Sequence, residues 1–139
     1  MKKDMPIPTE YQEQCRIFEW ARLMVSTGQE PRLRLLRAGM EGVRLTIGTR
    51  VKAKRAGMDS SWPDLTLFVP KTATIYPDPR RHIVFHALLI ELKRVKGGMV
   101  SPEQRAMHYL LMDQGYEVCV CRGADEAINT IKAYLGMEG

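Results

Sequence analysis

The sequence predicts an α/β domain in which a small mixed β-sheet is flanked by helices. Two patterns carry this prediction: apolar residues recur at three- to four-residue spacing near both ends of the chain, and shorter apolar or alternating runs lie between those segments. A length of 139 residues allows one compact domain with its own core and is too short for two ordinary ones. We therefore expect residues 1–139 to form a single domain.

The first third of the chain predicts a helix followed by a strand. The helix begins at Thr9 or a neighbour and runs to about Val25, after which Gly28 ends it. Residues 33–38 then predict a short strand. The next segment, residues 43–57, is rich in lysine and arginine, and its apolar residues do not distinguish a helix from a loop, although we expect its second half to be helical.

The middle of the chain predicts two strands separated by a connection. Residues 65–69 predict the first strand, and residues 71–81, which contain two prolines, predict a surface loop. Residues 83–93 form a long, largely apolar run that predicts a central strand buried on both faces. This run is far shorter than the roughly 20 residues of a membrane-spanning helix, so no membrane segment is expected.

The last third begins with the clearest helix start in the sequence. Ser101 can cap this helix, a proline occupies its first turn, and Gln104 stands three residues after the cap, so the helix should run from here to Gly115. Residues 116–122 alternate as a strand, and residues 125–135 predict a closing helix. The expected order of elements is α, β, possible α, β, β, α, β, α.

Composition and charge indicate a protein of a reducing compartment that binds a polyanion. The chain has 21 Lys and Arg residues against 16 Asp and Glu residues, a net charge of +5 and a pI near 9.3, which favours a polyanion such as nucleic acid. The first residues carry positive charge but no apolar stretch follows them, so they do not resemble a secretory signal. Three cysteines, an odd number, fit free thiols. A cytoplasmic protein is the simplest interpretation.

Two short segments contain the residues with the clearest chemical meaning. Asp64 follows Pro63 directly before a predicted strand, whereas Glu91 and Lys93 lie two residues apart at the end of another. Residues two apart in a strand project from the same face, so Glu91 and Lys93 should project together. If the two strands are neighbours, Asp64 and Glu91 can share a hard cation such as Mg²⁺, with Lys93 beside it.

This set of groups suits phosphodiester hydrolysis. A divalent metal lowers the pKa of a bound water and neutralises the phosphate, and a nearby amine positions or deprotonates the nucleophile. Each motif alone also has an ordinary structural explanation, because Pro-Asp is common at turns and Glu-x-Lys is common as a surface ion pair. Their joint occurrence, in this order and on these elements, favours a functional site.

The same residues resemble the PD-(D/E)xK nuclease superfamily, and in particular its VRR-NUC branch. The motifs that carry the resemblance are Arg55-Ala56-Gly57, Pro63-Asp64-Leu65, Ile90-Glu91-Leu92-Lys93-Arg94, Ser101-Pro102-Glu103-Gln104 and Gly115-Tyr116-Glu117-Val118. The resemblance covers nearly the whole chain and implies a restriction-endonuclease-like core. One departure is Ser61, where the family usually has a glycine two residues before the proline.

The resemblance implies a role for each residue of the two motifs. Asp64 and Glu91 would be metal ligands, and the backbone carbonyl of Leu92 would add a third oxygen. Lys93 would be the catalytic lysine. The ion implied is Mg²⁺ or Mn²⁺.

Two further residues are implied, each with an alternative. Gln104 matches the family's glutamine after the lysine motif and would orient the site, but it also fits a capping box that needs no catalytic role. The family carries a catalytic-site glutamate in its first helix, for which Glu10 fits best by its spacing to Gln14 and Trp20, with Glu13 as the other option. A solvated glutamate favoured by the helix dipole is the alternative for Glu10.

The resemblance also implies the substrate and the assembly. Stand-alone members of this branch are small viral or bacterial proteins that act as homodimers on branched DNA such as four-way junctions. The chain is therefore expected to be a Holliday-junction resolvase in the cytoplasm of a bacterium or a phage-infected cell. The alternatives are a nuclease for flaps or single-stranded ends with the same fold, a DNA-binding module without activity, and an α/β interaction protein in which the motifs are coincidental.

Three other groups of polar residues have weaker functional interpretations. The basic stretch from Arg44 to Arg55 either contacts phosphates or only keeps one face solvated. His82 and His86 are four residues apart, which on a strand separates them by about 13 Å, too far to bind one ion. A Cys-x-Cys pair at residues 119–121 lacks a second pair of ligands, so a zinc site is not expected.

Overall fold

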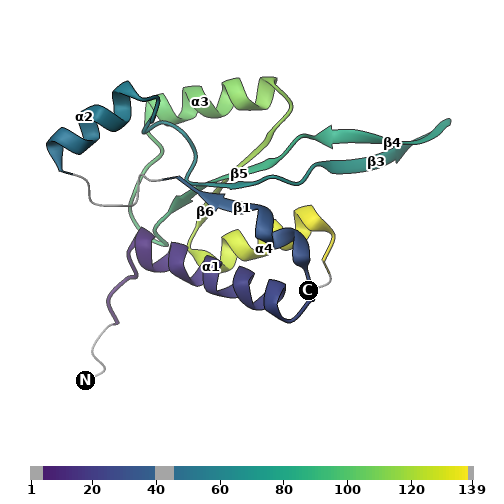
Figure 1. Ribbon diagram of the computed structural model, residues 1–139, viewed down its shortest axis with the longest axis horizontal. Helices are drawn as coiled ribbons and strands as arrows, with labels where there is room; N and C mark the ends of the chain where they lie inside the picture. Colours follow the sequence, from purple (N-terminus) through teal and green to yellow (C-terminus); the bar gives the residue numbers. More distant parts are fainter. Residues whose placement is uncertain (1–4, 40–45, 138–139) are drawn as a thin grey trace.

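A four-stranded mixed sheet forms the centre of the computed structural model, which describes residues 5–39 and 46–137 (Figure 1). The strands, in sheet order, are β1 Leu36–Ala38, β2 Leu65–Leu67, β5 Leu88–Lys93 and β6 Glu117–Arg122. β1 pairs antiparallel with β2 and β2 with β5, whereas β5 and β6 are parallel. The predicted α/β fold with a small mixed sheet is thus confirmed.

Helices cover both faces of this sheet. α1 (Glu10–Ser26) and α4 (Ala124–Leu135) lie against one face, and α3 (Pro102–Asp113) lies on the other (Figure 1). A parallel pair such as β5–β6 requires a crossover connection, and α3 supplies it. α2 (Ile47–Arg55) extends from the body at one end, and none of its residues is buried. Among the described residues, no helix is both long and apolar enough to span a membrane.

The predicted starts of α1 and α3 are confirmed by their capping hydrogen bonds. The Thr9 hydroxyl accepts the Gln12 N–H at 3.1 Å, and the Gln12 side chain accepts the Thr9 N–H at 2.9 Å. Ser101 and Gln104 form the same reciprocal pair at the start of α3. Each pair satisfies two N–H groups that would otherwise lie outside the helical ladder, so the local sequence alone positions these starts.

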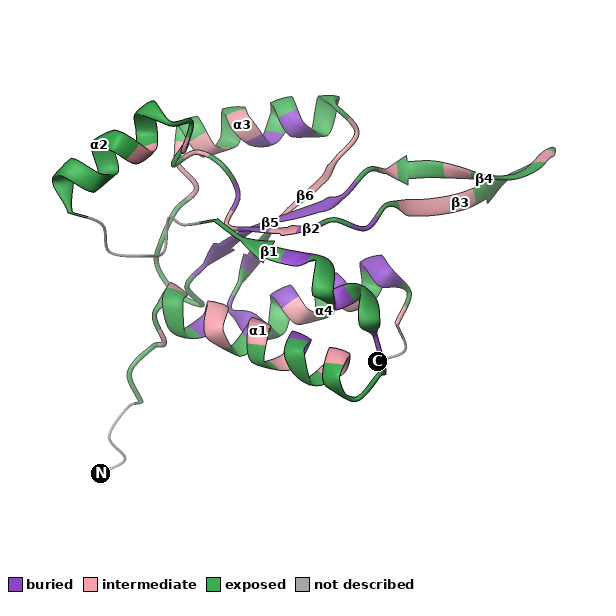
Figure 2. Cartoon of the chain, viewed as in Figure 1, coloured by how far each residue is buried: buried purple, intermediate pink, exposed green. Residues whose placement is uncertain are grey.

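The core lies between the sheet and the layer formed by α1 and α4. Every residue of β5 is buried, as predicted for a central strand (Figure 2). Fully buried apolar side chains from three elements meet in this layer: Ile17, Leu88, Ile90, Leu92 and Ile131. Because side chains alternate along a strand, Glu91 and Lys93 project from the opposite face of β5, toward α3.

Residues 71–81, expected to form a loop, belong instead to a two-stranded hairpin. β3 (Lys71–Ile75) pairs antiparallel with β4 (Asp78–Phe85), and the hairpin projects away from the body (Figure 1). The prediction of a loop is wrong because Pro77 and Pro79 do not prevent strand pairing in this hairpin. A two-stranded ribbon has an open edge on both strands, where proline is tolerated.

The long run at residues 83–93 is also not one strand, as was predicted. β4 ends at Phe85 and β5 begins at Leu88, with a bend between them. His86 lies in this bend and donates its N–H to the Gly115 carbonyl at 2.9 Å. A Cβ added at Gly115 would lie 2.9 Å from the His86 ring, so the bend needs a glycine at this position. Hydrophobicity did not reveal the bend because apolar residues lie on both sides of it.

The remaining predictions concern the strand at residues 33–38 and the helix within residues 43–57. Only Leu36–Ala38 of the strand predicted at residues 33–38 is extended, because the preceding residues form a 3₁₀ helix, η1 (Pro31–Leu35). A proline at the first position favours such a helical turn. α2 confirms the helix expected in the second half of residues 43–57.

Candidate active site

Antiparallel pairing of β2 with β5 brings Asp64 and Glu91 together. Leu65 pairs with Ile90, so the next position along each strand sets Asp64 opposite Glu91. Directly opposed residues project from the same face, with Cβ atoms about 4.5–5.5 Å apart. Asp64 Oδ2 also accepts the Leu92 N–H at 2.7 Å. Two carboxylates that lie 27 positions apart in the sequence thus meet at one strand end.

Pro63 has a specific consequence at this strand end. Continuing the same register sets Pro63 opposite Leu92. Because proline has no N–H, it cannot donate a ladder hydrogen bond to the Leu92 carbonyl. The Leu92 N–H is bound by the Asp64 side chain rather than by a backbone carbonyl. The Pro-Asp dipeptide therefore ends the ladder where carboxylate and carbonyl oxygens come together.

α3 docks against the face of β5 that carries Glu91 and Lys93. Lys93 Nζ donates to Gln104 Oε1 at 3.2 Å, and His108 Nε2 lies 3.2 Å from Glu91 Oε1. Two residues along a strand advance about 6.6 Å and four residues along a helix advance about 6 Å, so the two pairs match in spacing. The same Gln104 oxygen also accepts the Ser101 N–H, so one side chain caps the helix and contacts Lys93.

His108 is a member of this cluster that the sequence analysis missed. It is 5% exposed, and its hydrogen-bond partner Glu91 lies 17 positions earlier in the chain. The available signal was its spacing of four residues from Gln104, which puts both side chains on one face of α3. That signal was too weak without the structure, because a histidine on a buried helix face is common in protein cores.

Burial shifts the pKa values of Glu91 and His108, which contact each other. Burial of Glu91, followed by the nearby Asp64 and Glu10 carboxyls, raises the pKa of Glu91 to about 9, although Lys93 acts in the opposite direction. Burial also lowers the pKa of His108, and Lys93 adds to this effect. A protonated Glu91 can donate to a neutral His108 ring, which fits their contact. The site thus contains three carboxyl groups, those of Asp64, Glu91 and Glu10, and one lysine, Lys93.

The two candidate glutamates of α1 have different surroundings. Glu13 is 2% exposed and accepts a hydrogen bond from the Ala124 N–H, at the start of α4. Glu10 faces the site instead. A Cβ added at Gly98 would lie 3.8 Å from both Glu10 Oε1 and Lys93 Cδ, so the carboxylate and the lysine stem border the same small space.

The oxygens at this strand end fit a hard cation. Within residues 5–39 and 46–137, no three His, Cys, Asp or Glu side chains gather into a metal-binding group. Mg²⁺ does not require one, because it commonly binds through one or two carboxylates and keeps several waters. Asp64, Glu91 and the Leu92 carbonyl provide oxygen ligands of the right kind. Burial and the neighbouring carboxyls raise the pKa of Glu91, and a cation held between these oxygens would oppose that effect.

The other histidines and the cysteines lie outside this cluster. His82 lies in β4, where its ring contacts Asp78, and His86 lies in the bend before β5. Cys119 and Cys121 are free thiols of β6. Burial raises the pKa of the Cys119 thiol to about 11, which disfavours the thiolate that zinc requires.

The fold and the domain model that matches the chain together define a nuclease domain, and its mixed sheet brings two carboxylates and a lysine to one strand end. The VRR-NUC domain model matches residues 5–125, and the chain belongs to this family. The solved structure of a VRR_NUC domain protein aligns with a TM-score of 0.71 over 96% of this chain and 93% of that chain, at 21% identity, which supports the fold. No curated protein matches the chain. Nucleases of this family generally depend on a metal.

Substitution of the two α1 glutamates should separate activity from stability. Glu13→Ala removes the acceptor at the start of α4 and should lower the free energy of unfolding by about 2 kcal/mol. Glu10→Ala should change that free energy by less than about 0.5 kcal/mol and should slow DNA cleavage. Urea unfolding and cleavage, measured on the same preparations, test both statements. A Glu10→Ala protein that cleaves normally would remove Glu10 from the site.

Proposed function

We propose that the protein is a Mg²⁺- or Mn²⁺-dependent endonuclease that cuts branched DNA, with the four-way junction as its leading substrate, and that it acts as a homodimer. The observation that carries the proposal is the pairing of Asp64 with Glu91 beside the Leu92 carbonyl and Lys93. The net charge of +5 supports a polyanionic substrate. The choice of the junction and the dimer rests on the resemblance of the motifs to stand-alone junction resolvases.

Each residue of the site has a defined task in this proposal. Asp64, Glu91 and the Leu92 carbonyl would hold the ion, which when bound lowers the pKa of a water molecule and offsets the charge of the phosphate. Lys93 carries its ammonium on the same face as Glu91, where it binds a phosphate oxygen or orients the attacking water. Glu10 contributes a carboxylate from the α1 side, which can accept a hydrogen bond from that water.

Gln104 and His108 act as positioning residues. Gln104 accepts a hydrogen bond from Lys93 Nζ and so limits the directions that the ammonium can take. His108 contacts one carboxylate oxygen of Glu91 at 3.2 Å, which leaves the other oxygen for a ligand. Hydrogen bonds of this kind from the surrounding shell orient metal ligands in many enzymes.

α2 is proposed to contact the phosphate backbone of one DNA arm. None of its residues is buried, and it carries four cations and no acidic residue: Arg50, Lys52, Lys54 and Arg55. Only a short segment separates the end of α2 from Pro63-Asp64, so α2 is connected closely to the site along the chain. Arg44, the first member of the predicted basic stretch, lies outside the described residues.

Removal of charge from α2 should weaken DNA binding in a salt-dependent way. Each phosphate contact contributes about 0.9 to the slope of log affinity against log salt for duplex DNA. The Lys52→Ala/Lys54→Ala variant should therefore lower that slope by about 1.8. Binding of a four-way junction over a range of salt, in EDTA to prevent cleavage, measures the slope, and Lys132→Ala on α4 is the matched control. An unchanged slope would mean that α2 is only a solvated face.

The direct test is cleavage of a labelled four-way junction, a flap and a linear duplex of matched sequence, each with Mg²⁺ and with EDTA. The proposal expects metal-dependent, paired cuts in the junction and slow cleavage of the linear duplex. Paired cuts require two sites in related orientations, which a two-fold dimer supplies. Sedimentation measures the dimer at the working concentration. Equal cleavage rates on all three substrates would contradict selectivity for the junction.

A nuclease for flaps or single-stranded ends is the second candidate. The same arrangement of carboxylates and lysine serves either substrate, because the chemistry occurs at one phosphodiester bond in both. The observation that favours this candidate is a groove lined by arginines beside the site. A metal-binding protein without cleavage of any DNA would instead support the inactive DNA-binding module.

A further inference from the structure

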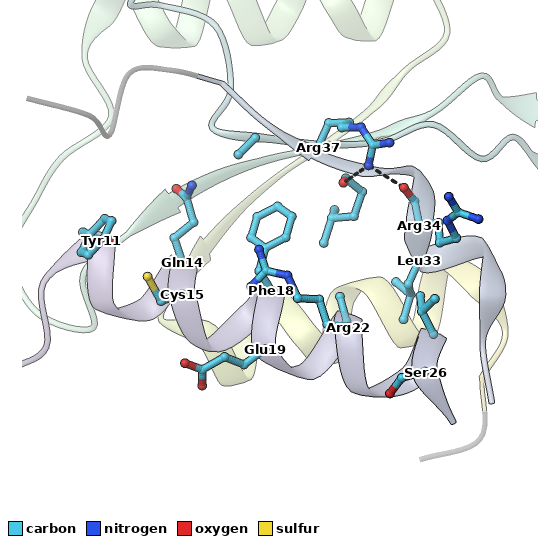
Figure 3. A pocket seen from close by; sticks show the side chains of 14 residues that line it. Tyr11, Gln14, Cys15, Phe18, Glu19, Arg22, Ser26, Leu33, Arg34 and Arg37 are labelled. Carbon is cyan, nitrogen blue, oxygen red and sulfur yellow. Dashed lines mark hydrogen bonds between the residues drawn. The ribbon is translucent and has the colours of Figure 1, made fainter. Parts of the chain in front are cut away.

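A groove separates α1 from the segment formed by η1 and β1 (Figure 3). Its volume is about 620 Å³. The α1 side of the groove extends from Tyr11 to Ser26, about 22 Å at about 1.5 Å per residue. A volume of this size spread over such a length gives a narrow groove, which suits one extended chain rather than a duplex.

Arginines give the groove a positive charge. Arg22, Arg34 and Arg37 line it, and all are exposed. Glu19 is the acidic residue among the described lining residues. Figure 3 shows the Glu19 side chain pointing away from β1, whereas Phe18 rises from α1 into the space below β1. The charge that a bound chain meets is therefore positive.

Two of these guanidinium groups are held in place. Arg37 Nη1 donates to the carbonyls of Arg34 and Leu36 (Figure 3). The Arg22 guanidinium lies 5.8 Å from the centre of the Phe18 ring. A cation above an aromatic ring combines a charge for a phosphate with a flat surface for a base, as in grooves that bind single-stranded nucleic acid.

The same contacts argue against an added peptide strand as the occupant. The Leu36 carbonyl is occupied by Arg37, and the Leu36 N–H donates to the Leu33 carbonyl. Strand addition depends on free backbone groups at the edge of a sheet. The charge and the flat ring favour a polyanion that carries bases.

The groove opens beside the candidate active site. Ala38 lines it, and the next residue, Gly39, donates its N–H to the Asp64 carbonyl at 3.1 Å. On the α1 side, the lining residue Tyr11 directly follows Glu10. The groove therefore reaches the strand end that carries Asp64 from the α1 side, where Glu10 also lies, whereas Glu91 and Lys93 project toward α3.

We propose that this groove binds an unpaired DNA strand that leaves the branch point next to the cleaved phosphate. The inference rests on the proposed cleavage of branched DNA and extends its substrates from the four-way junction to branches that carry a single-stranded arm, such as a flap or a splayed end. Arg22, Arg34 and Arg37 contact phosphates of the strand. The exposed Tyr11 ring, and the Arg22 guanidinium that lies over Phe18, provide flat surfaces on which its bases stack.

The test measures binding of fluorescent oligothymidylate by Asp64→Asn protein in EDTA, so that neither metal nor cleavage enters. Arg22→Glu/Arg34→Glu should weaken binding about ten-fold or more and lower the salt slope by about 1.4, since each single-strand phosphate contact contributes about 0.7. Arg80→Glu, whose side chain is 83% exposed in the hairpin outside the groove, is the matched control and should bind as the parent does. Equal binding by the groove variant, or no binding by the parent, would overturn the inference.

Cys15 gives a local readout that needs no substitution. Its half-buried thiol lines the groove, whereas Cys119 lies on β6 outside it. Bound oligothymidylate should slow alkylation of Cys15 by N-ethylmaleimide several-fold and leave that of Cys119 unchanged, as followed by peptide mass spectrometry. Unprotected Cys15 at saturating oligothymidylate would place the strand elsewhere and overturn the inference.

Cleavage assays distinguish failure of this inference from failure of the proposed function. The wild type should cut a junction with an unpaired arm faster than the same junction without it, and Arg22→Glu/Arg34→Glu should remove that preference. Equal rates with both substrates would overturn the groove inference alone. No cleavage of any branched DNA with Mg²⁺ or Mn²⁺ would overturn the proposed function, while metal-free binding of oligothymidylate would still decide for or against the groove.

Discussion

Asp64→Ala should slow DNA cleavage by about a thousand-fold or more, equivalent to about 4 kcal/mol of transition-state stabilisation. The substitution removes one carboxylate from the proposed metal site. It also removes the acceptor of the Leu92 N–H. Single-turnover cleavage of a labelled four-way junction at saturating Mg²⁺ measures the effect.

Asp64→Asn separates the loss of charge from the loss of structure. Its amide oxygen can still accept the Leu92 N–H, so the protein should unfold at the wild-type urea concentration and yet cleave as slowly as Asp64→Ala. Asp113→Asn, at the exposed end of α3, is the matched control and should cleave normally. A wild-type rate for Asp64→Asn with Mg²⁺ would contradict the assignment of Asp64 as a ligand.

The metal-free protein should lose stability as the pH rises from about 6.5 to about 9. Folding raises the pKa of Glu91 from 4.5 to about 9, so in this range the folded state still holds a proton that the unfolded chain has already released at lower pH. The free energy of unfolding then falls with increasing pH. His108, whose pKa is lowered from 6.5, acts in the opposite direction, but only at lower pH. Thermal unfolding in EDTA at several pH values measures the trend.

Glu91→Gln should flatten this trend, because the amide does not titrate. Mg²⁺ should raise the melting temperature of the wild type more at pH 9 than at pH 6.5, since the ion replaces a proton that is already weakly held at the higher pH. It should not stabilise Glu91→Gln to the same extent. Glu103→Gln, an exposed glutamate of α3, is the control. A wild-type pH trend in Glu91→Gln would assign the titration to another group.

Elements with local signals were predictable from the sequence. The starts of α1 and α3 depend on a Thr or Ser cap and a Gln three residues later, and the structure contains both reciprocal pairs. The hairpin at residues 71–85 and the bend at His86 were not predictable in the same way. Their conformation depends on hydrogen bonds with distant partners, such as the Gly115 carbonyl, which no local pattern reports.

The same distinction applies to the candidate site. Pro63-Asp64 and Glu91-Leu92-Lys93 were identifiable in the sequence because each motif is a short run with a recognisable chemistry. Whether Asp64 meets Glu91 depended on the register of β2 with β5, which is set by pairing across the sheet.

The outer members of the site depended on how the helices pack. Docking of α3 brings His108 to Glu91, and docking of α1 turns Glu13 toward α4 and Glu10 toward Lys93. The sequence left Glu10 and Glu13 as alternatives because they lie three residues apart on one helix, a spacing that allows both side chains to face the protein. Packing against the sheet and α4 distinguishes their surroundings, because side chains of different elements meet only in the folded chain.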